Sequence, residues 1–145
     1  MVTVTDGSVV IDAIGAHAFE NCRSLREINI PESVTTIQTS VFAGCASLTA
    51  IALPKGVTWV RGSAFQDCTG LKEIRVHASV PPKADYQAFY GVDTETCKLM
   101  VPEGTRDAYK EADEWKEFDI QEDATLSIQE NEINDDSIKV YAVQN

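Results

Sequence analysis

The sequence predicts a solenoid: a right-handed α/β-type coil of about four stacked repeats, with short parallel strands, helical or irregular turns and a C-terminal helical cap. Two observations support the coil. The 145-residue chain repeats with a period of 23 residues, and each period contains a short stretch in which apolar and polar residues alternate. A third observation, an apolar stripe after residue 104, predicts the cap. Such repeats bury their apolar side only by stacking on their neighbours.

Three stretches, residues 11–31, 34–54 and 57–76, align column by column. The first contains the seven apolar columns at Ile11, Ile14, Phe19, Cys22, Leu25, Ile28 and Ile30. Alternation at the end of each stretch indicates a short strand with one buried face. A proline then ends the first two strands, because it has no amide hydrogen for a ladder. The small residues between strands predict a turn that places one aromatic column in the interior, at Phe19, Phe42, Phe65 and Phe89.

The fourth copy is less regular. Val80 keeps the first column, but Phe89 follows Phe65 by 24 residues, so one residue has been inserted. Val92 replaces the cysteine, and residues 98–102 form the matching strand. Cys97 falls outside the repeat columns and could be exposed.

The pattern C-x-x-L-x-x-I-x-I/L-P, followed by V-T-x-I and A-F-x-x-C, resembles the BspA-type (Treponema-type) leucine-rich repeat of bacterial surface proteins. The resemblance covers about residues 9–104, and it implies a leucine-rich repeat solenoid. It also implies a non-catalytic extracellular module with adhesin-like binding of host or bacterial surface proteins or glycans. Residues 101–109 and 115–118 resemble the closing segment that commonly follows such repeats.

The repeats, residues 11–104, are flanked by three further segments. Residues 1–10 predict an N-terminal strand pair around Asp6-Gly7, a partial repeat or a cap. Residues 105–120 predict a capping helix that begins at Thr105 or Asp107, with an apolar stripe at Tyr109, Ala112, Trp115 and Phe118. Residues 121–145 predict an acidic linker and, at 137–143, the first strand of a β module. By the resemblance, such tails often belong to export or surface-anchoring modules.

Charge excludes some partners. The net charge is −11 and no basic stripe exists, so neither nucleic acid nor anionic lipid is an expected partner. No apolar run is long enough for a membrane span, and the first residues do not form a signal peptide. A simpler interpretation is that the charge maintains solubility.

No catalytic, metal or cofactor site is predicted. Cys22, Cys45 and Cys68 share one column, which allows either a redox ladder or small buried hydrophobes, and we favour the latter because three stacked thiols cannot all pair. His17 and His77 lack the spacing of metal ligands. No activated nucleophile stands out either, so an enzyme is the least favoured of three interpretations.

Outward strand positions are the candidate ligand-binding residues. If the apolar strand residues point inward, the intervening side chains point outward. They vary in type between copies, which is typical of a surface without packing constraints, and they include two alanines, Ala50 and Ala52. The candidates are Arg26, Glu27, Asn29, Thr49, Lys72, Glu73, Arg75, Lys98 and Met100.

Trp59 is a separate candidate, because it occupies a column that is otherwise small, at Ala13 and Thr36. Exposed tryptophans are enriched in binding hot spots, but this one could instead cover the next coil or Pro81-Pro82. The second interpretation of the whole strand face is an inert, solvated sheet, in which case the protein would be a structural spacer on the cell surface.

Overall fold

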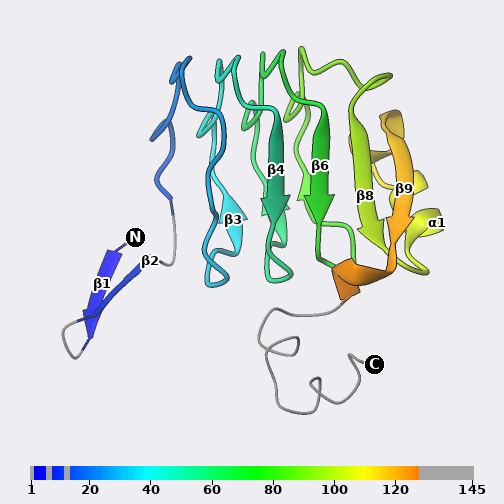
Figure 1. The fold of residues 1–145 in the computed structure, drawn as a ribbon, viewed down its shortest axis with the longest axis horizontal. Coiled ribbons are helices and arrows are strands. Elements are labelled where there is room, and N and C mark those ends of the chain that lie inside the picture. Colours follow the sequence, from blue (N-terminus) through cyan, green and yellow to red (C-terminus); the bar gives the residue numbers. More distant parts are fainter. Residues whose placement is uncertain (1, 6–7, 12–13, 128–145) are drawn as a thin grey trace.

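The computed structural model describes residues 2–5, 8–11 and 14–127, and the strand predicted at 137–143 lies outside them. The described chain forms a solenoid whose coils are stacked side by side (Figure 1). Nine strands, one α-helix and two 3-10 helices are described. Their bounds are β1 Val2–Thr5, β2 Ser8–Ile11, β3 Thr36–Ile37, β4 Ala50–Leu53, β5 Trp59–Val60, β6 Glu73–Val76, β7 Lys83–Ala84, β8 Lys98–Pro102, α1 Arg106–Lys110, η1 Trp115–Glu117, β9 Asp119–Asp123 and η2 Ala124–Ser127.

Each central coil contributes one strand to each of two parallel sheets, ordered β4-β6-β8-β9 and β3-β5-β7. Between β4 and β5 the chain turns back at Pro54, whose carbonyl accepts the Val57 amide at 3.1 Å. Equivalent residues of successive coils are paired directly, as with Ile51 and Ile74. The predicted leucine-rich repeat solenoid is therefore confirmed.

The aromatic column is continuous through the interior. Ring centroids of Phe19 and Phe42 lie 5.7 Å apart, and the next two steps, to Phe65 and to Phe89, are each 5.4 Å. Adjacent rings are within 20° of parallel. The prediction of a shared aromatic interior is confirmed, because rings at this spacing can stack only when the coils are in register.

The turns repeat a demanding backbone conformation. One column with positive φ contains Asn21, Gly44, Asp67 and Gly91, and glycine, asparagine and aspartate are the residues that tolerate this conformation best. A Cβ atom on Gly44 would lie 2.2 Å from the Asn21 side-chain oxygen, and one on Gly91 would lie 2.4 Å from that of Asp67. In this column glycine alternates with asparagine or aspartate, because the Asn21 and Asp67 side chains occupy the space that a Cβ atom on the next residue of the column would need.

The fourth coil corrects one prediction. Val80 was expected in the buried first column, but its side chain is 74% exposed, whereas Val57 is 1% exposed. Trp59 pairs with Lys83, 24 residues later, so the inserted residue lies before β7. The cap bonds to this altered turn: the Tyr109 hydroxyl donates to the Ala78 carbonyl at 2.6 Å, and the Trp115 indole donates to the Pro82 carbonyl at 2.7 Å.

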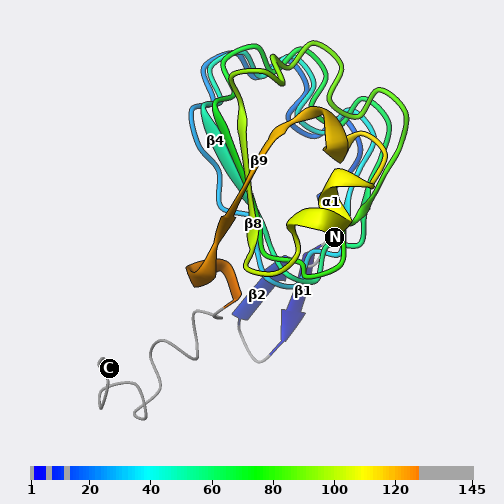
Figure 2. The same ribbon diagram turned by 90° about the vertical axis from the view of Figure 1, so that its right-hand side faces the viewer.

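The C-terminal end is closed by α1, η1 and β9 (Figure 2). The apolar stripe faces inward: Tyr109 and Trp115 are fully buried and Phe118 is 6% exposed. The boundary expected after residue 120 falls inside β9, which continues the sheet by pairing with β8.

The start of α1 also differs from the prediction. Thr105 occupies the N-cap position but makes no side-chain capping bond, and its hydroxyl instead donates to the Pro102 carbonyl at 2.7 Å. The Glu122 carboxylate of β9 accepts the amides of Gly104 and Arg106, each at 3.0 Å. The backbone amides at the start of α1 therefore find their hydrogen-bond acceptor on β9, the strand that follows the cap helices.

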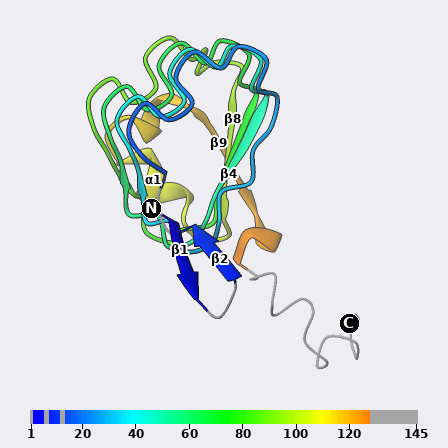
Figure 3. The same ribbon diagram turned by 90° about the vertical axis from the view of Figure 1, so that its left-hand side faces the viewer.

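At the other end, β1 and β2 pair as an antiparallel hairpin beside the first coil (Figure 3). The two expected strands are thus present, while the Asp6-Gly7 turn lies outside the described residues.

Candidate functional site

The outward side of the β4-β6-β8-β9 sheet is the candidate site, and we call it the outer face. Burial alternates along its strands: in β4 the side chains of Ile51 and Leu53 are buried, whereas those of Ala50 and Ala52 are exposed. The outward columns run across paired strands, so Ala50, Glu73, Lys98 and Asp119 form one row. The structure brings together nine of the sequence-predicted residues on or beside this face: Arg26, Glu27, Asn29, Thr49, Lys72, Glu73, Arg75, Lys98 and Met100.

Exposure differs among these nine residues. Glu73, Arg75 and Met100 are half-buried, and the other six are exposed. The face contains equal numbers of both charges, although the chain as a whole has a net charge of −11. The cationic residues are Arg26, Lys72, Arg75 and Lys98, and the acidic residues are Glu27, Glu73, Asp119 and Asp123.

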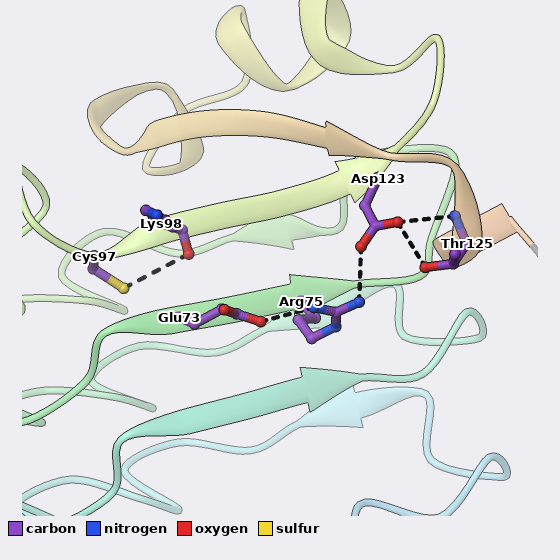
Figure 4. A network of polar contacts seen from close by, with 6 residues as sticks. All are labelled: Glu73, Arg75, Cys97, Lys98, Asp123 and Thr125. Atoms are coloured by element: carbon purple, nitrogen blue, oxygen red, sulfur yellow. Dashed lines mark hydrogen bonds and ion pairs between the residues drawn. The ribbon is translucent and has the colours of Figure 1, made fainter.

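Arg75 is held by two carboxylates (Figure 4). One guanidinium nitrogen lies 2.8 Å from the Glu73 carboxylate, and the other lies 2.9 Å from the Asp123 carboxylate on β9. Asp123 is held in turn by the Thr125 hydroxyl at 2.6 Å and the Thr125 amide at 2.9 Å. These Thr125 hydrogen bonds, followed by Arg75, lower the pKa of Asp123, and the Glu73 hydrogen bond is the largest cause that raises the pKa of Arg75.

This network gives the face a defined geometry. Two ion pairs restrict the rotamers of Arg75, so less conformational entropy remains to be lost when a partner binds. Beside it, the small side chains of Ala50 and Ala52 leave the β4 backbone accessible. Arg75 was predicted as a ligand-binding side chain; in the structure its fork already binds carboxylates, and its role in positioning the face is the one that the geometry supports.

Trp59 does not belong to the outer face, since it lies on β5 in the other sheet. Its indole nitrogen donates to Asp85 at 3.0 Å. The Arg61 guanidinium lies 4.1 Å from the ring centroid and the Lys83 ammonium 5.0 Å from it. The half-buried ring therefore contacts the next coil through Lys83 and Asp85, while Arg61 covers it from within its own coil. Of the two predicted roles, covering the next coil describes this geometry, and Trp59 and Arg75 lie on different sheets.

The four cysteines are free thiols. Cys45 and Cys68 donate to the carbonyls of Phe19 and Phe42 in the preceding coil, at 3.2 and 3.1 Å. Burial raises the pKa of Cys68 to about 12 and that of Cys97 to about 11. Cys97 is fully buried, so the expectation that it could be exposed is wrong: it lies where the chain enters β8. These thiols are poor nucleophiles, because the thiolate is the reactive form.

Sequence reasoning missed two groups of surface residues. Asp119, Gln121 and Asp123 extend the outer face by one strand but were assigned to the cap and the acidic linker; the alternation around Ile120, which pairs with Leu99, was the available signal. Tyr86 and Tyr90 are 80% and 58% exposed. They follow Gly62 and Gln66 by 24 residues, so large aromatics in otherwise small or polar columns were the signal there.

Comparison with known proteins identifies the family. A family model described as "BspA type Leucine rich repeat region (6 copies)" matches residues 6–114, well over half of the chain. The chain belongs to this BspA-type leucine-rich repeat family. It is similar to the crystal structure of a leucine-rich repeat protein from Bacteroides ovatus ATCC 8483, with a TM-score of 0.55 and 26% identity. That match covers 84% of this chain but 28% of the other, so the chain spans less than a third of its relative's length. No curated protein matches the sequence.

The BspA-type repeat architecture suggests a protein-interaction module. Within the part of the chain that the structure describes, no cluster of histidine, cysteine, aspartate and glutamate side chains could hold a metal ion. No described helix is long and apolar enough to cross a membrane.

Proposed function

We propose that the protein is a non-catalytic recognition module of a bacterial cell surface, and that it binds a protein partner through the outer face. The observation that carries this proposal is the contrast between columns. Inward columns keep apolar residues from coil to coil, as with Ile51, Ile74 and Leu99, whereas outward columns combine both charges with two alanines. A surface so free of packing constraints, on a rigid backbone, can be fitted to a ligand without changing the fold.

The charge of the face favours a protein partner of mixed charge. Four cationic and four acidic side chains lie on or beside it, so neither a polyanion nor a polycation would be complementary over its whole area. Affinity would come from many contacts spread over several strands. The cell-surface setting rests on the family, whose members are widespread in bacterial surface proteins.

The test is binding to a panel of purified extracellular-matrix proteins and mucosal glycoproteins immobilised on a biosensor. We expect saturable binding to at least one of them. Ala52→Arg places a bulky cation in the middle of the outer face and should weaken that binding by about tenfold or more, the effect of obstructing an interface centre. Ala108→Arg is the matched control, because Ala108 is an exposed alanine on α1, away from the face.

Two outcomes contradict the proposal. Equal loss in both variants would mean that added charge, and not the outer face, governs binding. Absence of saturable binding to any panel member would favour the alternative function, a structural spacer. Labelling of intact producing cells with an antibody against the repeats tests the cell-surface setting independently.

A further inference from the structure

The last coil and the cap together form a second distinctive surface, away from the outer face. A shallow hollow of about 210 Å³ lies between them. Its lining includes Tyr86, Phe89, Tyr90, Thr94, Glu114 and Glu117. It is therefore formed by two segments that are distant in sequence and that meet only in the folded protein.

Aromatic side chains form one part of the hollow. Tyr86 and Tyr90 are 80% and 58% exposed, although both are large and partly apolar. The solenoid does not require them, because the equivalent positions one coil earlier are Gly62 and Gln66. The ring of Phe89 is held below them by contacts with Trp115 and Phe118 at 5.0 and 5.1 Å between ring centroids.

The charged groups that line the hollow are both acidic: Glu114 and Glu117. Lys116 lies between them in sequence, but its ammonium is 3.5 Å from Asp113, outside the lining. Burial is the largest cause that raises the pKa of Glu114; the Gln87 amide lowers that pKa, Glu117 and Asp113 raise it further, and the charge of Lys116 lowers it least. The carboxylates therefore repel one another and lack a cation among the lining residues.

We propose that this hollow is a docking site for a basic side chain, a lysine of a partner protein, which would place its ammonium between the carboxylates and its methylenes against the tyrosine rings. Charge complementarity selects this occupant. The faces of aromatic rings attract cations, and a carboxylate adds a charge-assisted hydrogen bond. An anionic ligand would meet two like charges. The site is separate from the outer face, so it does not depend on the function proposed above.

The probe is N-acetyl-lysine N-methylamide, titrated into the 15N-labelled 145-residue chain at millimolar concentrations and followed by amide chemical shifts. A single side chain in a shallow site should bind with a Kd in the millimolar range, on the order expected for a ligand of so few atoms. We expect saturable shifts at Gln87, Tyr90 and Glu117. The matched neutral probe, N-acetyl-norleucine N-methylamide, keeps the aliphatic chain without the ammonium and should bind about tenfold more weakly.

Variants then assign the contacts. The double variant Tyr86→Ala/Tyr90→Ala should remove saturable binding, and Glu117→Gln should weaken it about threefold to tenfold, as expected for loss of a charged hydrogen bond. Both tyrosines and Glu117 are exposed, so these variants keep the fold. Glu111→Gln, at an exposed carboxylate of the cap outside the hollow, should leave binding unchanged.

Three results would overturn the proposal: equal binding of the norleucine probe, survival of the shifts in the double tyrosine variant, or a loss in Glu111→Gln as large as in Glu117→Gln. Saturation by methyl β-glucoside in place of the lysine probe would also overturn it, by assigning the tyrosines to a glycan.

Discussion

The two ends of the solenoid are completed differently, although the same columns run through both. At the C-terminal end, Phe89 is 4% exposed because Trp115 and Phe118 cover it. At the N-terminal end, Phe19 and Leu25 are only partly buried, whereas their equivalents one coil later, Phe42 and Leu48, are completely buried. Burial of a repeat residue is thus decided by its neighbouring coils and not by its own column.

The backbone shows the same asymmetry. In the turn region each coil donates amides to the carbonyls of the next coil, as Phe19 does to Val41 at 2.9 Å and Phe65 to Ala88 at 2.8 Å. Amides of the last coil therefore point towards the cap, where Glu114 faces the Gln87 amide. Near β4 the direction is reversed, because the Thr49 amide donates to the Arg26 carbonyl of the first coil at 3.4 Å. The asymmetry of the backbone is therefore confined to the turn region.

The largest expected effect separates the closed end from the open end. Trp115→Ala should lower the free energy of unfolding by about 3–5 kcal/mol, since it removes a fully buried ring. Phe19→Ala should cost about 1 kcal/mol, because this ring is only partly buried. Urea denaturation of both variants measures the difference. Equal losses would show that the two ends are equally closed.

The glycine column gives the next largest effect. Gly91→Ala should cost about 2–3 kcal/mol, because the residue has a φ of 91° and the new Cβ meets the Asp67 backbone as well as its side chain. Gly44→Ala should cost about 1–2 kcal/mol, since the closest atom is the terminal oxygen of Asn21, which lies in the partly open first coil. Thermal unfolding of the two variants compares them. A larger loss at Gly44 would contradict the comparison.

The buried interior also predicts a pH dependence. The Cys68 and Cys97 thiols, with pKa values raised by burial to about 12 and about 11, stay protonated in the folded chain. Above about pH 9 they ionise in the unfolded chain, so unfolding releases protons and stability falls as pH rises. The slope between pH 9 and 10 should be about 1 kcal/mol per pH unit for each thiol, approaching about 1.4 kcal/mol per pH unit once the unfolded thiol is fully ionised. Urea denaturation should show a smaller slope for Cys68→Ala than for the parent; equal slopes would refute this account.

The smallest expected change in stability tests how much the ion pairs of Arg75 contribute to holding β9 against the sheet. Arg75→Ala removes both ion pairs and should cost at most about 1 kcal/mol, because its side chain is 36% exposed and water screens the charges. The loss should shrink in 1 M NaCl. Arg26→Ala, at an exposed arginine of the first coil, should change stability less. A salt-independent loss would indicate that packing of the arginine stem, and not its charge, is what matters.

Prediction from sequence succeeded where the relevant signal is repeated. The aromatic and cysteine columns recur every 23 residues in the first three copies, and the coils align as that spacing requires. It failed where one contact decides the outcome. Val80 kept its column in the alignment but is exposed, because the inserted residue before β7 shifts the turn that contains it, and the cap bonds to that turn. The sequence also did not show that the Trp59 ring would contact Arg61, Lys83 and Asp85.

The sequence by itself determined the coil, its period, its inward columns and the face that its strands present. Those properties follow from local alternation and from a spacing that the first three copies repeat. Only the tertiary structure decided which end is closed, that β9 extends the sheet, and that Arg75 is bound to Asp123, 48 residues away. Each of these depends on a single pairing between distant segments, and no repetition in the chain encodes a contact that is made once.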